Sequence, residues 1–402
     1  MEIVFIDPEP PSAAGGGIRT YLTLALTLCR EAGMEARVYT HNPDAYPPGA
    51  GFPIGRKAWL RPPIRGLAYR LLYQENVLWE HACWLNAELQ AGDRPDRVYE
   101  FADYLGYGFF ALRNRALRDR TILRVHTPDF LARSAPAAGT KEGWARVLSA
   151  WREKDGLRRA RRITAPSAQF MRENLPWMAG WEYVPNPLPP RPPVAARVDT
   201  SERGTLRPAE GGISRPTRSE PQRFLYLGRV EERKGVLVLV RAFMRLAAEN
   251  PQSSLTLVGS AVPGPYSEGV RALIESLPGP LRQRIDWQAP CLPEARADLF
   301  LRHHALVTPS LFENSPYVYF EGMAAGLACI GSATGEMKAV AAITGALSPR
   351  PGDEESWLEA LRAHCAGASE QALGKQAAYL SDRRAGIAAQ SIAAWRKAAG
   401  AA

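Results

Sequence analysis

The same local pattern occurs twice in this chain and limits the folds open to it. A short apolar stretch at residues 3–6 is followed by a glycine loop at 15–17 and then by a helix-length segment with an apolar residue every three to four positions. The residues of that stripe are Ile18, Leu22, Ala25, Leu26 and Cys29. Gly33 suits the helix C-terminus, and residues 36–39 form the next apolar run. The pattern predicts a βαβ unit.

The second copy begins at residues 224–227, continues through a loop at 228–235 and a helix at 236–249, and reaches another strand at 255–258. Two such copies in 402 residues predict an α/β protein with two Rossmann-like, doubly wound domains. The expected boundaries are an N-terminal Rossmann-like domain at 1–187, a Pro-rich linker at 188–221, a C-terminal Rossmann-like domain at 222–375, and a helix at 376–402 that crosses back to the first domain.

Composition excludes several classes of protein. The chain is 46% hydrophobic and 23% charged, as in globular proteins, and it has no apolar run long enough to span a membrane. No signal peptide precedes the first strand, so a cytoplasmic location is expected. The cysteines are odd in number and scattered: Cys29, Cys83, Cys291, Cys329 and Cys365. This spacing favours reduced thiols over disulfides or a metal site.

The net charge is +9, and basic residues cluster in two segments of the chain. Residues 51–73 contain five cations, no acid and the aromatic residues Trp59 and Tyr69, and residues 158–162 contain four arginines. Such a surface suits an anionic membrane or a phosphorylated ligand, and it is equally compatible with a solvated surface. Peripheral contact with the inner face of a membrane is therefore one hypothesis. No nucleic-acid-binding motif accompanies the charge, so nucleic acid is not expected as a partner.

Doubly wound sheets bind ligands beyond the carboxyl ends of their strands, so the loops there are the candidate sites. The loop at 228–235 holds Arg229 and Lys234, five residues apart, between a strand and a helix. These cations and the helix N-terminus can converge on a diphosphate. Taken alone, this loop is more typical of a solvated charged turn.

A second loop follows the apolar run at 305–308 and contains Glu313. Pro316 suits the first turn of a helix that should end at Gly326, and Glu321 then lies about a turn and a half inside that helix. With this spacing, one carboxylate can meet a sugar while the other meets a ribose.

Together, Arg229 with Lys234 and Glu313 with Glu321 resemble the hallmarks of the retaining GT-B glycosyltransferases of family GT4. The resemblance covers nearly the whole chain, because the segments at 15–17, 124–128, 164–167 and 184–187 also match in order. It implies two Rossmann-like domains facing a cleft.

The resemblance also implies roles for individual residues. Arg229 and Lys234 would stabilise the leaving diphosphate, Glu313 would contact the donor sugar, and His126 would point towards that sugar, although a lone histidine is often structural. The implied donor-binding residues are Gly16, Gly17, Gly228, Asn314, Ser315, Pro316, Tyr317 and Glu321.

Two features fit the family less directly. Glu100 and Asp103 follow a first-domain strand and could bind acceptor hydroxyls, but Asp103 suits a helix N-cap equally well. The segment 334–338 has Lys338 where the family often has a glutamate, so this loop gives no inference about the donor.

The predicted function is retaining transfer of a sugar from a nucleoside-diphosphate sugar to a glycan, lipid-linked or small-molecule acceptor. No Asp-x-Asp motif is present, so neither a metal nor another cofactor is expected. The alternatives are a sugar phosphorylase or sugar-nucleotide epimerase of the same architecture, or a non-catalytic nucleotide-sugar-binding protein. Addition of phosphate would reveal a phosphorylase, and donor turnover separates an enzyme from a binding protein.

Overall fold

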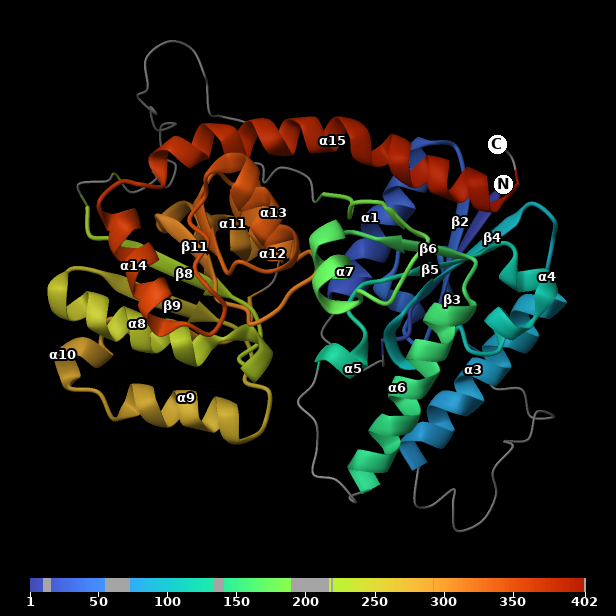
Figure 1. Ribbon diagram of the computed structural model, residues 1–402, viewed down its shortest axis with the longest axis horizontal. Helices are drawn as coiled ribbons and strands as arrows, with labels where there is room; N and C mark the ends of the chain where they lie inside the picture. Colours follow the sequence, from blue (N-terminus) through green and yellow to red (C-terminus); the bar gives the residue numbers. More distant parts are fainter. Residues whose placement is uncertain are drawn as a thin grey trace. The chain divides into compact units, whose positions relative to one another are not determined.

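The computed structural model describes residues 1–9, 16–54, 73–132, 141–188, 217, 220–291 and 293–400. The chain forms two compact units, shown in Figure 1. The first unit comprises Met1–Pro187 and Ala385–Ala402, and the second unit comprises Leu188–Arg384. Gly15, most of the basic segment at 51–73 and most of the predicted linker lie outside the described residues.

The first unit is built on a parallel sheet of seven strands in the order β3-β2-β1-β4-β5-β6-β7. The strands are β1 (Glu2–Ile6), β2 (Glu35–Thr40), β3 (Gly51–Pro53), β4 (Arg97–Ala102), β5 (Thr121–Arg124), β6 (Arg162–Ala165) and β7 (Trp181–Tyr183). Every residue of β1, β4 and β5 is buried, as expected for the centre of a parallel sheet.

Helices connect these strands. They are α1 (Gly17–Glu31), α3 (Tyr73–Ala91), α4 (Arg115–Arg118), α5 (Asp129–Ala132), α6 (Lys141–Arg159) and α7 (Ala168–Asn174), with 3₁₀ turns η1 (Pro43–Ala45), η2 (Tyr104–Gly106) and η3 (Ala111–Arg113). Helix α1 buries Tyr21, Leu22, Ala25, Leu26 and Cys29, and Gly33 follows it with φ of +65°. Four of these five residues belong to the stripe predicted from the sequence.

The second unit has a five-stranded parallel sheet in the order β10-β9-β8-β11-β12. Its strands are β8 (Arg223–Leu227), β9 (Ser254–Val258), β10 (Ile285–Gln288), β11 (Ala305–Thr308) and β12 (Ala328–Gly331). Its helices are α8 (Val236–Glu249), α9 (Pro265–Glu275), α10 (Gly279–Arg282), α11 (Pro293–Arg302), α12 (Tyr317–Ala324), α13 (Gly335–Thr344) and α14 (Glu354–Cys365), with a 3₁₀ turn η5 (Glu232–Lys234).

Two apolar cores lie on the two sides of this sheet. Helices α8, α9 and α14 bury one face through side chains such as Phe243, Val270 and Trp357. Helices α11, α12 and α13 bury the other through side chains such as Phe300 and Phe320. The last helix, α15 (Glu370–Ala398), begins in the second unit and continues into the first at Ala385. None of the described helices is both long enough and apolar enough to cross a bilayer.

The strand order of each sheet reverses direction at one point. In the first unit β1 lies between β2 and β4, and in the second unit β8 lies between β9 and β11. Loops diverge at such a switch point and leave room for a ligand beyond the carboxyl ends of the strands. The loops after β8 and β11 therefore meet where the second unit can best hold a ligand.

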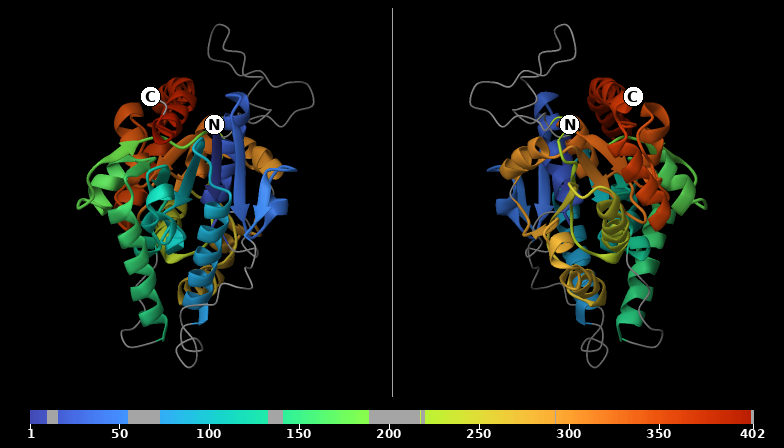
Figure 2. Two further views of the ribbon diagram at one scale, coloured as in Figure 1. Left: turned by 90° about the vertical axis from the view of Figure 1, so that its right-hand side faces the viewer. Right: turned by 90° about the vertical axis from the view of Figure 1, so that its left-hand side faces the viewer.

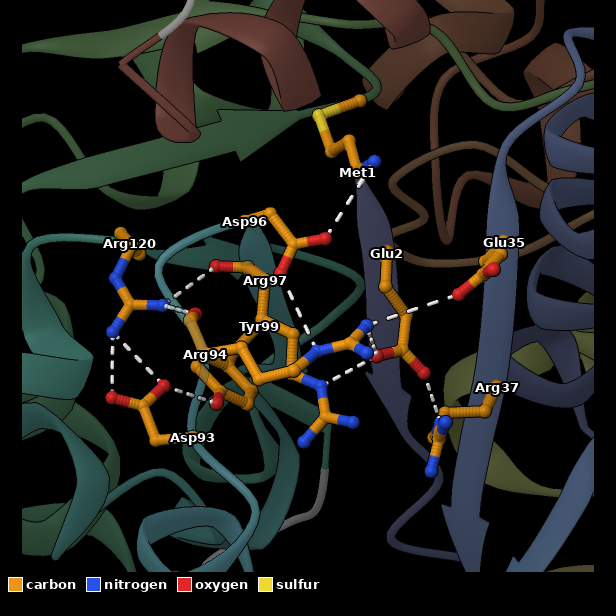
Figure 3. Close-up of polar contacts among 10 residues, drawn as sticks. All are labelled: Met1, Glu2, Glu35, Arg37, Asp93, Arg94, Asp96, Arg97, Tyr99 and Arg120. Carbon is orange, nitrogen blue, oxygen red and sulfur yellow. Dashed lines mark hydrogen bonds and ion pairs between the residues drawn. The ribbon is translucent and has the colours of Figure 1, made fainter.

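The amino-terminal edge of the first sheet is held by charge (Figure 3). Glu2, at the start of β1, is 1% exposed and accepts hydrogen bonds from Arg97 Nε at 2.5 Å and Arg94 Nη2 at 2.8 Å. Arg37 on β2 pairs with the other carboxylate oxygen. Since Arg97 lies on β4, this one carboxylate joins three adjacent strands at the edge opposite the switch-point loops.

We expect Glu2→Gln to lower the free energy of unfolding by on the order of 3 kcal/mol, because it removes the charge that compensates partly buried guanidinium groups. Urea unfolding followed by circular dichroism measures the change. The control is Glu35→Gln, whose side chain is 77% exposed and contacts Arg94 only at 3.8 Å. Equal stability of Glu2→Gln and the unaltered protein would show that the edge depends on apolar packing alone.

Candidate active site

The loops after β8 and β11 touch at the switch point of the second unit. Gly235 ends the first loop with φ of +66°, and a Cβ atom there would lie 2.0 Å from the carbonyl oxygen of Pro309 in the second loop. The amide of Leu311 donates to the carbonyl oxygen of Arg233 at 2.8 Å. Only glycine allows this approach, and it brings Lys234, with Arg233 beside it, next to the predicted glutamate, Glu313.

Glu313 is the centre of the resulting cluster. Its Oε1 accepts hydrogen bonds from Arg233 Nη1 at 2.9 Å, from Ser310 Oγ at 3.2 Å and from Lys234 Nζ. Glu313 is 6% exposed. Burial raises the pKa of this carboxyl group, but the charges of Lys234 and Arg233 outweigh burial and lower the pKa to about 2. The carboxylate is therefore ionised, and all these bonds use the same oxygen.

The three cations of the β8 loop have different surroundings. The Arg229 side chain is 59% exposed and pairs with Glu231 at 3.1 Å. Arg233 is 13% exposed and bridges Glu231, at 2.9 Å, to Glu313. Arg233 is not among the residues predicted from the sequence, and its place beside Lys234 in a short loop is the signal that points to it. Lys234 and Arg233 contact Glu313, while Arg229 leaves its guanidinium open to solvent.

The loop after β12 supports the segment that follows Glu313. Gly335 has φ of +52°, and a Cβ atom there would lie 1.8 Å from the carbonyl oxygen of Glu313. The amide of Glu336 donates to the carbonyl oxygen of Asn314 at 2.8 Å. The Glu336 carboxylate, 2% exposed, accepts hydrogen bonds from Ser315 Oγ and from Arg383 on α15. Glu336 thus holds Asn314 and Ser315 in place. Lys338, two residues further along, is exposed.

The remaining second-unit candidates lie around α12 and β8. Pro316 is the N-cap of α12 and Tyr317 its first residue. Glu321 lies inside α12, where both carboxylate oxygens are 3.1 Å from Arg296 Nη1 of α11. Burial raises the pKa of Glu321 despite Arg296. Gly228 directly follows β8, and its amide donates to Val258 at 3.0 Å.

In the first unit, His126 follows β5 and is half-buried. Its amide donates to Asp103 Oδ1 at 3.0 Å, and its ring meets the Tyr21 ring edge-on, with centroids 4.9 Å apart. Burial and the charge of Arg124 hold the pKa of His126 well below its usual value. The imidazole is therefore neutral at physiological pH and can donate or accept one hydrogen bond at each nitrogen.

Gly16 and Gly17 begin α1. Gly16 is the N-cap, and its amide donates to Glu9 Oε2 at 3.0 Å. A Cβ atom on Gly16 would lie 2.2 Å from Glu9 Oε1. The Glu9 carboxylate pairs in turn with Arg19 at 3.5 Å. The beginning of α1 is thus packed closely against the loop that follows β1.

The two acids predicted to bind acceptor have internal partners. Glu100, 3% exposed, accepts hydrogen bonds from Tyr21 Oη at 2.5 Å and from Trp395 Nε1 on α15 at 2.7 Å. This geometry favours a structural role for Glu100. Asp103 occupies the N-cap position of η2, but its side chain makes no capping bond there and accepts the amide of His126 instead.

The described residues contain no group of three or more His, Cys, Asp or Glu side chains arranged to hold a metal ion. In the second unit, the acids nearest the switch point are paired with cations: Glu313 with Lys234 and Arg233, and Glu321 with Arg296. Two doubly wound parallel sheets in one chain, of which the second has this cation–carboxylate cluster at its switch point, agree with the GT-B fold predicted from the sequence.

Comparison with known proteins gives the family. Residues 221–366 match the family described as "Glycosyl transferases group 1", and residues 16–200 match the "Glycosyl transferase 4-like domain". The chain belongs to the group 1 glycosyl transferases, family GT4, and is a nucleotide-sugar-dependent glycosyltransferase. No curated protein sequence matches the chain.

Solved structures agree with this fold. Sucrose-phosphate synthase from Thermosynechococcus elongatus has a TM-score of 0.72 at 19% identity, with 100% of each chain covered. The lipopolysaccharide outer core galactosyltransferase WaaB, in its apo form, has a TM-score of 0.58 at 15% identity over 98% of this chain and 99% of that one. HepE of Anabaena, in complex with UDP and glucose, has a TM-score of 0.64 at 14% identity over 98% of each chain.

The charge interactions of Glu313 should make the stability of the protein depend on pH. The native pKa of Glu313, about 2, lies below the value near 4.3 of an unfolded glutamate. The ionised group therefore stabilises the fold fully above about pH 4.5, and this contribution is lost as the pH falls towards 2. We expect Arg233→Met to raise that pKa and to cost about 2 kcal/mol at pH 7.

The stability gap between Arg233→Met and the unaltered protein should narrow as the pH falls from 4.5 towards 2. Chemical unfolding at several pH values measures the gap. Arg229→Met is the matched control, because the exposed Arg229 has no contact with Glu313, and it should leave stability unchanged. A pH-independent gap for Arg233→Met would mean that Arg233 contributes packing rather than charge.

Proposed function

We propose that the protein transfers a sugar from a nucleoside-diphosphate sugar with retention of anomeric configuration and without a metal. The observation that carries this proposal is the Glu313 cluster. Lys234 and Arg233 both engage Oε1, and Arg229 lies exposed in the same loop. The site thus combines an ionised carboxylate for the sugar with cations for an anionic leaving group.

The donor diphosphate is proposed to bind beyond β8. There Lys234 and Arg229 supply positive charge, and α8 begins directly after Gly235. A helix N-terminus attracts anions through its unpaired amides and its dipole. The complex of HepE with UDP and glucose supports a nucleoside diphosphate as the ligand type. The ribose is assigned to Glu321, whose side chain Arg296 holds in place.

In the proposed reaction, the bond between the anomeric carbon and the diphosphate oxygen breaks, and the acceptor oxygen bonds to the same face of that carbon. The acceptor hydroxyl proton passes to the departing phosphate oxygen. Negative charge grows on the phosphate, where each positioned donor contributes on the order of 3 kcal/mol of transition-state stabilisation. Cations of the protein thereby take the role that a divalent metal has in other transferases.

The acceptor is proposed to bind in the first unit, at the carboxyl ends of β4 and β5. His126, which the resemblance assigns to the donor sugar, lies after β5, where its neutral ring can hydrogen-bond a sugar hydroxyl. Asp103 holds its backbone amide. Gly16 and Gly17 are assigned to the donor side because they begin α1 at the neighbouring strand. The proposed acceptor is a glycan, a lipid-linked sugar or a small molecule.

Lys234→Met and Glu313→Gln should have different effects. Lys234→Met should weaken binding of the nucleoside diphosphate at least tenfold, because it removes a cation from the diphosphate. Glu313→Gln should lower kcat by a factor on the order of 100 and leave nucleotide affinity within about threefold.

Calorimetric titration with nucleoside diphosphates measures the change in affinity, and assays of nucleoside-diphosphate release measure the change in kcat. Arg245→Met, an exposed cation that pairs with Glu355, is the control. Unchanged affinity in Lys234→Met would refute the diphosphate assignment.

Transfer should proceed in EDTA and keep the donor's anomeric configuration. A panel of nucleoside-diphosphate sugars incubated with sugar acceptors identifies an active pair, and proton NMR of the early product reads its anomeric coupling. Activity that returns only with magnesium or manganese would contradict the metal-free mechanism. An inverted product would contradict front-face attack.

A further inference from the structure

Helix α6 exposes an unusual number of apolar side chains. Val147 is 60% exposed, Leu148 38% and Trp151 46%, all within two turns of one helix. Trp177 is 45% exposed and lies beside the end of α6, where Arg158 covers its ring at 5.5 Å. These are four of the six exposed large hydrophobic side chains in the described residues; the others are Tyr183 and Ile343. Clusters of this kind mark interaction surfaces.

Cationic side chains extend this exposed apolar surface along α6 and form one stripe with it. Val147, Trp151, Lys154 and Arg158 follow one another at spacings of four, three and four residues, so they lie on one face of α6 over about 16 Å. Lys154 Nζ lies 4.9 Å from the centre of the Phe130 ring. The acid beside the stripe, Asp155, is neutralised by Arg113 at 2.8 Å and Arg159 at 3.0 Å. The stripe is thus apolar at one end and basic at the other.

The opposite face of α6 supports the loops at the carboxyl ends of β4 and β5. Glu153, 1% exposed, accepts hydrogen bonds from the amide of Leu105 at 2.8 Å and from those of Asp129 and Phe130, both at 3.1 Å. Leu105 has φ of +60°, a rare conformation for a side chain of its kind. Helix α6 therefore presents the stripe on its outer face, and its inner face holds the segment that follows His126 in place.

We propose that the outer face of α6, together with Trp177, docks the protein on an anionic lipid bilayer. Val147, Leu148 and the tryptophan rings would enter the headgroup region, and Lys154 and Arg158 would meet lipid phosphates. A second copy of the chain fits less well, because parallel pairing of two such stripes would oppose their cations and antiparallel pairing would set the cations of each against the apolar end of the other. Figure 2 shows α6 extending well away from the sheet, alongside α3.

This inference rests on the proposed function and narrows it to a lipid-linked acceptor. Docking through α6 would bring lipid phosphates close to the loops that Glu153 holds. It involves described residues only and is independent of the basic segment at 51–73.

The test is co-sedimentation of the full chain with phosphatidylcholine vesicles, with and without phosphatidylglycerol. We expect binding only with phosphatidylglycerol, weakened by high salt. Val147→Glu and Arg158→Glu should each reduce the partition coefficient at least about fivefold, the equivalent of about 1 kcal/mol near the surface. Val147 is chosen over Trp151, which packs on Phe109 at 5.4 Å. Ile343→Glu, at a 63% exposed site of α13, is the matched control.

Two results would overturn the proposal. One is no binding to anionic vesicles at low salt, or binding that both α6 variants retain. The other is concentration-dependent dimerisation that Val147→Glu abolishes, which would assign the face to a second copy. Release of nucleoside diphosphate from donor in vesicle-free buffer is measured in parallel. Vesicle binding without donor turnover would contradict the proposed function alone, and turnover without vesicle binding would contradict the docking surface alone.

Discussion

The contact of Glu313 with Lys234 and Arg233 is the constraint on which the second unit's site depends. A buried carboxylate with two cations stabilises a fold little more than well-packed apolar side chains in its place would, because desolvation cancels much of the attraction. The contact matters because it fixes the positions of these three charged groups. The loops after β8 and β11 approach closely enough to form it only through Gly235, and the loop after β12 then closes on Glu313 through Gly335. The charges are thus fixed and partly dehydrated before a ligand arrives, as electrostatic catalysis requires.

Local patterns in the sequence predicted the elements that carry this site. The predicted helix at 236–249 and strand at 305–308 coincide with α8 and β11, because an amphipathic period and a buried apolar run are encoded within the segments themselves. Which arginine of the β8 loop contacts Glu313 depends on residues far away in the sequence. Arg229 and Arg233 lie four residues apart in one loop, yet only Arg233 reaches Glu313, eighty positions along the chain. No periodicity in the loop distinguishes them.

Glu100 and Asp103 show the same limit in the first unit. An acid just after a buried strand suits a binding site, and the sequence offers no way to see what faces it. Glu100 meets Tyr21, 79 residues away, and Trp395, 295 residues away. Asp103 meets the amide of His126, which follows a different strand. Their surroundings are set by the order of strands and by the path of α15, so they emerge only from the complete fold.

The carboxyl edges of the two sheets hold their buried acids by different means. In the second unit, cations lower the pKa of Glu313 to about 2. In the first unit, burial outweighs the backbone amides and raises the pKa of Asp103 to about 7 and that of Glu153 to about 8. Protonation of Asp103 and Glu153 is therefore possible near neutral pH, whereas Glu313 stays ionised beside Lys234 and Arg233. Fixed cations in the loop after β8 suit a diphosphate, and the neutral ring of His126 in the first unit can hydrogen-bond an uncharged hydroxyl. This electrostatic difference supports the proposal that the donor binds mainly to the second unit and the acceptor to the first.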